Sequence, residues 1–371
     1  MPVPEVQTKG ISHSYSNEFP LRGEGLTVPY NRGTFVNPYR QDVPPFVDIL
    51  FATFAFLFGL VFGSFLNVCI YRLPRGLSVV TPRSACPNCH KPIAAYDNIP
   101  VLSWIILGGK CRNCKTPITP RYAIVELVCG LLVLACYLEY GPKLGPSMMI
   151  DGTVFKVLLL PYLLRFLKYA ILAYLLLGLI FTDAETQLLP DKMTLPGLVI
   201  GLIFSVLVPM QDLVVMLFLE FVPFPIPHGH QVLWISVISS VTGAIVGGGF
   251  IWGVGALWKL ARGYEGMGFG DVKLMAMVGA YLGAATTLIV IFTASIMGSV
   301  IGLATIGIVY LQRRGRYVKK LGPAQGASRA RKAAFVAYRY LPMPFGVSLG
   351  AMALVAVYFS RYIYHWWLGT P

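Results

Sequence analysis

The sequence predicts an all-α polytopic membrane protein with about eight transmembrane helices and a small cytoplasmic zinc-binding insert. Three observations lead to this prediction. Hydrophobic residues make up 56% of the 371 residues and charged residues only 12%, whereas about a quarter of residues are charged in a soluble domain. Several apolar runs exceed the roughly 18 residues that a helix needs to cross a bilayer. Four cysteines form two CxxC pairs between the first two of these runs.

Residues 1–45 are rich in Pro, Gly, Asn and Tyr and show neither helical nor alternating periodicity, so we predict a flexible tail. This segment lacks the basic start, short apolar core and cleavage site of a signal peptide. The first transmembrane helix is expected at residues 46–71. Near its end stands Asn67, whose amide could simply hydrogen-bond a neighbouring helix.

The later apolar runs place a transmembrane core at residues 122–311 and a last transmembrane helix within 342–371. Residues 153–165 contain charges and Pro161, and we expect them to lie along the membrane interface as an amphipathic segment. The predicted crossings lie at about residues 46–70, 121–140, 166–181, 195–219, 232–260, 274–283, 285–311 and 345–366.

A polar insert at residues 72–121 carries two CxxC turns, formed by Cys86, Cys89, Cys111 and Cys114. This is the ligand spacing of a zinc ribbon or knuckle, in which each turn offers two thiolates to one tetrahedral ion. A pair of disulfides is the competing interpretation, which the reducing conditions of a cytoplasm disfavour. We therefore predict that the insert binds a structural Zn²⁺ ion.

The formal net charge is +14, and the basic residues are concentrated in the insert and in residues 312–341. The positive-inside rule explains this distribution if both segments face the cytoplasm. We predict that residues 312–341 form a solvated basic cytoplasmic loop rather than a surface for anionic lipid or nucleic acid, and we expect no nucleic-acid partner. If the tail lies outside, the eight predicted crossings place Asp183 and Asp271 on the same cytoplasmic face.

Asp183 ends one apolar run, and Asp271 stands in a glycine-rich hinge before another, at residues 266–273. An unpaired charge at membrane depth costs roughly 2.5 to 3.5 kcal/mol, so such carboxylates indicate function. Asp271 alone could merely cap a helix. Two neighbouring carboxylates, however, cannot both ionise, so one can act as general acid while the other activates water. The alternative is a transporter or channel that uses the pair as a proton relay.

Three motifs resemble the type IV prepilin peptidase family, whose members are membrane aspartic proteases of the GxGD type. Asp183 precedes Leu-Leu-Pro-Asp-Lys-Met-Thr-Leu-Pro, and Asp271 stands in Gly-Met-Gly-Phe-Gly-Asp-Val-Lys-Leu. The first span ends in Gly-Ser-Phe-Leu-Asn-Val, followed by Arg-Leu-Pro. The resemblance implies a bacterial inner-membrane enzyme with a cytoplasmic active site. Its substrates would be prepilins of type IV pili or pseudopilins of type II secretion.

The resemblance also implies a bifunctional enzyme, because many family members methylate the new amino terminus with S-adenosylmethionine. It makes Asp183 and Asp271 the catalytic pair. The resemblance places Glu126 near the methylation site, and the alternative is that its carboxylate forms a salt bridge with Arg121 or Arg72. The predicted supporting residues are Asp191, Gly268, Gly270 and Lys273, and the residues predicted to contribute to methyl transfer are Asn67, Arg72 and Glu126.

Overall fold

The computed structural model describes residues 45–142, 152–210, 212, 214–215, 231–264, 266–340 and 345–368. The described residues form helices and connecting turns, without a β-strand. Two isolated β-bridges occur, both in the insert. The predicted tail lies outside the described residues, apart from the first residue of the first helix.

The helices that carry the argument fall in two groups, an insert of short helices and a bundle of long ones. The insert contains η1 (Leu73–Arg75), η2 (Ala95–Asn98) and α2 (Leu102–Ile106). The bundle contains α1 (Pro45–Arg72), α3 (Arg121–Tyr140), α4 (Gly152–Thr186), α5 (Asp191–Leu207), α7 (Gln231–Arg262), α8 (Phe269–Leu282), α9 (Ala284–Leu321), α10 (Pro323–Tyr340) and α11 (Phe345–Leu368).

Within the described residues, five helices are long and apolar enough to cross a membrane, so the chain is a multi-pass membrane protein; these are α1, α3, α4, α7 and α9. α11 contributes a shorter apolar stretch at Phe345–Phe359. α8 has 14 residues and is about 21 Å long, which is less than the roughly 30 Å hydrocarbon thickness. The predicted count of eight crossings is therefore not established by helix length.

Three predicted boundaries are wrong. The segment 153–165 does not form a separate interfacial element, because α4 is one continuous helix that contains Pro161. Lys168, which lies just inside the predicted third crossing, is buried within the bundle, with its Nζ atom 3.7 Å from the sulfur of Met210. The fourth span does not reach residue 219, because α5 ends at Leu207, shortly before a proline.

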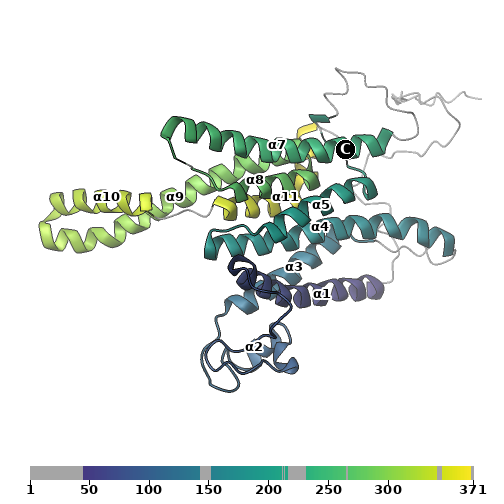
Figure 1. Ribbon diagram of the computed structural model, residues 1–371, viewed down its shortest axis with the longest axis horizontal. Helices are drawn as coiled ribbons and strands as arrows, with labels where there is room; N and C mark the ends of the chain where they lie inside the picture. The colour runs from purple at the N-terminus through teal and green to yellow at the C-terminus, as the bar shows by residue number, and fades with distance from the viewer. Residues whose placement is uncertain are drawn as a thin grey trace, which may run out of the picture. The chain divides into compact units, whose positions relative to one another are not determined.

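The third difference concerns the loop predicted at residues 312–341, where residues 312–321 continue α9 and residues 323–340 form α10. α9 continues through this region, Gly322 turns the chain with φ +79°, and α10 packs back against α9. Figure 1 shows this hairpin projecting from the end of the bundle at which α1 leads into the insert. A helix of 38 residues is about 57 Å long, so α9 exceeds the bilayer core and its basic end lies in water.

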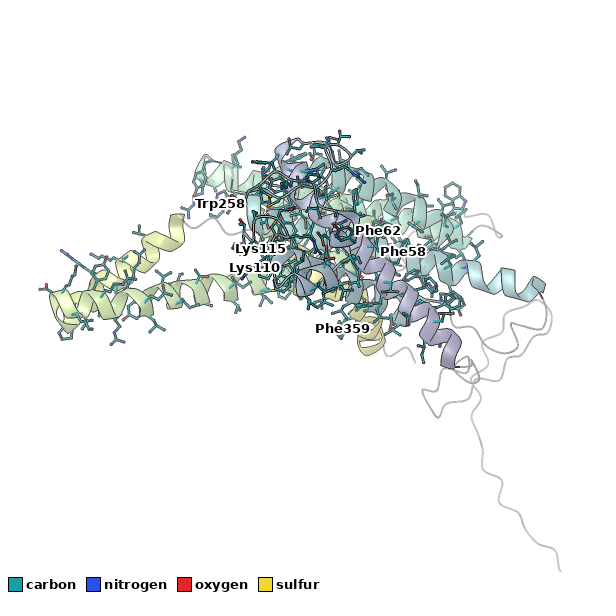
Figure 2. All side chains as sticks on the ribbon, turned by 90° about the horizontal axis from the view of Figure 1, so that it is seen from below. Phe58, Phe62, Lys110, Lys115, Trp258 and Phe359 are labelled. Carbon is teal, nitrogen blue, oxygen red and sulfur yellow. The ribbon has the colours of Figure 1, made fainter. Side chains whose placement is uncertain are left out.

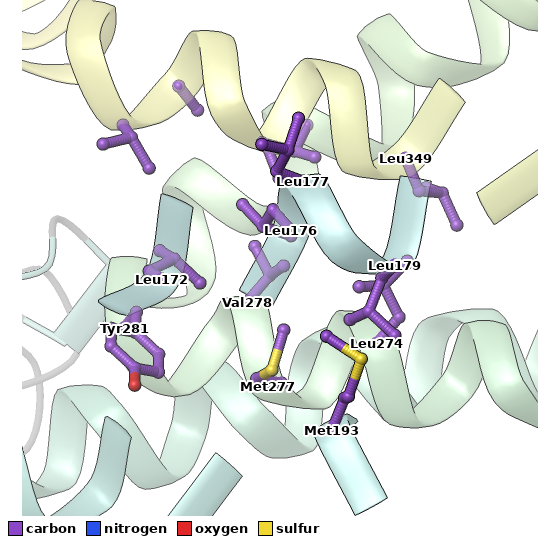
Figure 3. Close-up of a cluster of buried hydrophobic side chains, with 14 of the residues drawn as sticks. Leu172, Leu176, Leu177, Leu179, Met193, Leu274, Met277, Val278, Tyr281 and Leu349 are labelled. Carbon is purple, nitrogen blue, oxygen red and sulfur yellow. The ribbon is translucent and has the colours of Figure 1, made fainter. Parts of the chain in front are cut away.

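The core of the bundle forms where α4, α5, α8 and α11 meet (Figure 3). Leu172, Leu176 and Leu179 recur at helical spacing on α4 and are almost completely buried. They face Met277 and Val278 of α8, which are also fully buried. These contacts hold α8 next to α4, although the two helices are far apart in the sequence.

α7 holds α8 from the other side through contact between their backbones. A Cβ atom on Gly243 would lie 2.2 Å from the carbonyl oxygen of Gly279, and one on Gly279 would lie 2.0 Å from that of Gly243. Small residues allow this close approach of membrane helices. Since Asp271 lies in the first turn of α8, its position is set by α7 as well as by α4.

Candidate active site

A pocket of about 430 Å³ opens where the ends of four helices meet. The end of α4 and the following turn form one wall, and the glycine-rich segment before α8 forms another. The first residues of α5 and α11 complete the pocket. Its lining residues are Asp183, Gln187, Leu188, Leu189, Asp191, Gly266, Met267, Gly268, Phe269, Gly270, Asp271, Phe345 and Gly346.

Asp183 lies in the last turn of α4 and is buried, with 5% of its surface exposed. Its Oδ2 atom accepts a hydrogen bond of 2.9 Å from the backbone N–H of Val347, in the first turn of α11. The N–H groups of a first helical turn have no partner within the helix, and they carry the positive end of the helix dipole. The start of α11 therefore stabilises a negative charge on Asp183.

Asp271 is also buried, and it approaches Asp183 at Gly346. A Cβ atom on Gly346 would lie 2.7 Å from Oδ2 of Asp183 and 3.2 Å from Oδ1 of Asp271. Because Gly346 has a hydrogen atom in place of a side chain, the α11 backbone lies directly against both carboxyl groups. Within the described residues, the Asp271 carboxyl group has no hydrogen-bond donor like the one that Asp183 has. Two carboxyl groups this close hold one proton between them more readily than two negative charges.

Three of the four predicted supporting residues, Asp191, Gly268 and Gly270, line the pocket with this pair. Gly270 packs against Leu189, where a Cβ atom would lie 2.9 Å from the Leu189 Cβ atom, whereas Gly268 has open space beside it. Lys273 does not pair with Asp271; its Nζ atom lies 2.6 Å from Oδ1 of Asp191. This ion pair connects the start of α5 to α8, and because it is partly exposed it contributes only about 0–1 kcal/mol.

Of the residues predicted for methyl transfer, Asn67 and Arg72 lie on α1, and Glu126 lies on α3, one turn after the residue that Asn67 contacts. Asn67 is buried on α1 and donates a 3.0 Å hydrogen bond to the carbonyl of Tyr122, while its own Oδ1 atom has no partner among the described residues. Glu126 is buried on α3, where its Oε2 atom accepts a 2.7 Å hydrogen bond from the N–H of Val101. Arg72 instead donates to the carbonyls of Ser78 and Pro82.

The expected ion pair of Glu126 with Arg121 or Arg72 is therefore wrong. Arg121, at the start of α3, pairs with Glu185, which stands two residues after Asp183 on α4. The insert and the aspartate pocket are connected through this ion pair.

The sulfur atoms of Cys86, Cys89, Cys111 and Cys114 lie within 4.8 Å of one another. Cys86 Sγ and Cys114 Sγ are 3.7 Å apart, and two sulfurs on a tetrahedral zinc ion with bonds of about 2.3 Å would be about 3.8 Å apart. Hydrogen bonds from the side chain and backbone of Thr116 lower the pKa of the Cys114 thiol to about 5. All seven cysteines are free, so the donor set fits a Zn²⁺ ion.

Gly346 and Val347 are the site residues that the sequence did not reveal. The signal available was a Pro-Met-Pro-Phe-Gly run at residues 342–346, just before the last span. A glycine there is compatible with any helix start, and hydropathy does not say which helix ends meet. Only the packing of α11 against α4 identifies the role of these residues.

Two segments of the chain match known protein families. Residues 57–140 match the Bacterial Peptidase A24 N-terminal domain, and residues 170–303 match the Type IV leader peptidase family. The first match covers the later part of α1, the insert and α3, and the second contains both aspartates. No solved structure shows significant similarity to the chain.

Several curated proteins are similar over most of their length. One from Aeromonas hydrophila, named Prepilin leader peptidase/N-methyltransferase, is 31% identical over 343 residues, which cover 86% of this chain and 94% of the relative. Proteins of the same name from Neisseria gonorrhoeae and Klebsiella pneumoniae are 34% and 37% identical, covering 73% and 63% of this chain. The matched regions cover 85% and 86% of the length of those two relatives.

Proposed function

The chain belongs to the type IV leader peptidase family, and on this premise we propose that it removes the leader peptide from type IV prepilins or pseudopilins and then N-methylates the new amino terminus. The observation that carries the peptidase activity is the convergence of Asp183 and Asp271 on Gly346 inside a pocket. Both aspartates lie at helix ends, where a chain can enter from the membrane surface. The distribution of basic residues supports a cytoplasmic active site in a bacterial inner membrane.

In the proposed mechanism, the leader peptide lies extended along residues 266–270, where the open space beside Gly268 lets its backbone approach. Asp183 removes a proton from water, and the resulting hydroxide adds to the carbonyl carbon of the scissile bond. Asp271 gives its proton to the carbonyl oxygen, and that proton reaches the leaving amine when the bond breaks. Asp183 acts as base because the Val347 N–H stabilises its charge.

This assignment of roles predicts a change in pH dependence. Val347→Pro removes the N–H donor, and proline is tolerated in a first helical turn. The acid limb of the pH–rate profile should move to higher pH by about one to two units, because a hydrogen bond to a charged group contributes about 1.5–3 kcal/mol. Val347→Ala keeps the N–H and should keep the wild-type profile. If both variants show the wild-type acid limb, Asp183 is not the base.

For methyl transfer, we propose that Asn67 and Glu126 bind the methyl donor or the amine that accepts the methyl group. The unsatisfied Oδ1 of Asn67 offers a buried acceptor for an ammonium or amine group. S-adenosylmethionine supplies the methyl group when it is bound. Arg72 supports this region by holding the loop that follows α1.

We also propose that the four-cysteine cluster holds one structural Zn²⁺ ion. Replacing Cys86 or Cys111 with serine should lower the bound zinc from one ion per chain to almost none, because structural zinc sites rarely retain the metal with three ligands. Elemental analysis of the purified protein measures this. Cys129→Ser is the matched control, because Cys129 is buried in α3 and outside the cluster. Zinc-free wild-type protein with an unchanged amide-exchange pattern in the insert would contradict a structural metal.

The proposed function is tested by incubating the purified protein with a prepilin in proteoliposomes, with and without S-adenosylmethionine. Mass spectrometry of the product should show cleavage in both samples and one added methyl group only when the donor is present. A prepilin that stays intact would contradict the peptidase, and a cleaved but unmethylated product would contradict the second activity alone.

A further inference from the structure

We propose that α2 of the zinc insert is an interfacial membrane anchor, whose exposed apolar side chains are covered by the acyl chains and headgroups of the adjacent leaflet. The proposal concerns a surface that neither the peptidase nor the methyl transfer uses. It rests on the depth at which α2 is held, on the face that it exposes, and on the charges around it.

The depth of α2 is fixed by a hydrogen bond to a membrane-spanning helix. The N–H of Val101, the residue before α2, donates to Glu126 at 2.7 Å. Glu126 is the sixth residue of α3, which qualifies as a membrane span over its whole length of 20 residues. At 1.5 Å per residue, Glu126 lies about 7.5 Å inward from the start of that span. Since a span of 20 residues is about as long as the hydrocarbon core is thick, the start of α2 lies about 7.5 Å inside the edge of that span, a depth that interfacial helices reach.

This attachment is firm enough to hold Val101 in an unusual conformation. Val101 has φ +60° and ψ −49°, and a β-branched residue rarely adopts a positive φ. Its carbonyl also accepts a 3.1 Å hydrogen bond from the N–H of Ile105. The carbonyl of Val101 is thus bonded within α2, and its N–H is bonded to the membrane-spanning helix α3.

α2 has one face that packs on the insert and one that is half or more exposed among the described residues. Ser103 is buried and donates to the carbonyl of Tyr96, and the Trp104 indole N–H donates to the carbonyl of Ile118. On the other face, Leu102, Ile105 and Ile106 are 50%, 61% and 70% exposed. Three large aliphatic side chains on five helical residues would be unfavourable in water, but they suit a helix lying in the membrane surface.

The charges of the insert complement anionic headgroups. Asp97 is the one acidic residue between 72 and 121, and it is neutralised by Arg112 at 2.6 Å. The cations Lys110 and Lys115 are exposed. Figure 2 shows these two lysines at one end of α1, while Phe58 and Phe62, 61% and 41% exposed, lie farther along it. Cations at the membrane surface and apolar groups at depth are the arrangement of an interfacial anchor.

Photo-crosslinking in the full-length protein tests the anchor. The photoreactive residue p-benzoylphenylalanine replaces Ile106, and the protein is irradiated in nanodiscs that contain phosphatidylglycerol and phosphatidylethanolamine. Phe58, on the exposed face of α1, is the positive control. Gln325, which is exposed beside the turn between α9 and α10, is the negative control. Mass spectrometry of the digested protein identifies the partner of each adduct.

We expect lipid adducts at position 106 with a yield similar to that at position 58 and about tenfold or more above that at position 325, which is the partition expected for a buried aliphatic group. Adducts to a second copy of the chain, or no lipid adduct at 106, would overturn the proposal. A second measurement uses the double variant Ile105→Asp, Ile106→Asp. Amide exchange at residues 99–107 should become faster in nanodiscs while the zinc content stays the same. Unchanged exchange would likewise overturn the anchor.

Discussion

Asp183→Asn and Asp271→Asn are each expected to lower the rate of prepilin cleavage by about two to four orders of magnitude, the contribution of a general acid or base. Asparagine has the size of aspartate and fits the same pocket, but it can neither accept a proton from water nor donate one to the carbonyl oxygen. Since both carboxyl groups face Gly346, they act as a unit. The double variant should therefore be scarcely slower than either single variant.

The control for this experiment is Asp48→Asn. Asp48 accepts a 3.3 Å hydrogen bond from Tyr137 and does not line the pocket, so its replacement should leave cleavage close to the wild-type rate. Thermal unfolding of each variant in detergent checks that the bundle is intact. If one of the pocket variants cleaves at the wild-type rate while folded, hydrolysis does not use the aspartate pair, and a proton relay becomes the better account of these carboxyl groups.

The helix positions show what hydropathy can predict in a membrane protein. α3 occupies residues 121–140 as predicted, and α1 and α7 begin within one residue of their predicted starts. Bilayer thickness imposes this regularity on the sequence. Two of the three failures share a cause, because charge in the sequence does not reveal the surroundings of a side chain. The charges and the proline of residues 153–165 indicated an interfacial segment, but these residues belong to the continuous helix α4. The basic residues after 311 indicated a loop but lie on paired helices.

The family was predictable from the sequence, and the comparisons confirm it. The sequence also placed Asp183 and Asp271 at helix ends, because carboxylates next to apolar runs are conspicuous. The third part of the pocket was not predictable. Gly346 has no side chain, and the N–H of Val347 leaves no mark in the sequence. Such backbone contributions depend on which helix ends meet, and α11 follows α4 by more than 150 residues.

Gly346→Ala is therefore the second change for which we expect a large effect. The added methyl group would lie 2.7 Å from Oδ2 of Asp183, so α11, the carboxyl group or both must move. Overpacking of this kind costs about 1–3 kcal/mol. If this strain raises the activation free energy of cleavage by the same amount, cleavage should slow by roughly tenfold to a hundredfold.

A matched glycine separates this effect from a general effect of alanine in the bundle. Gly298 lies on α9, where a Cβ atom would make only ordinary contacts, 3.5 Å from Ser348 and 3.9 Å from Phe345 of α11. Gly298→Ala should keep the wild-type rate, and alanine should slightly favour the helix. Comparing prepilin cleavage and thermal unfolding for the two variants decides the question. If Gly346→Ala is as active as Gly298→Ala, the start of α11 does not determine how the two carboxyl groups are arranged during hydrolysis.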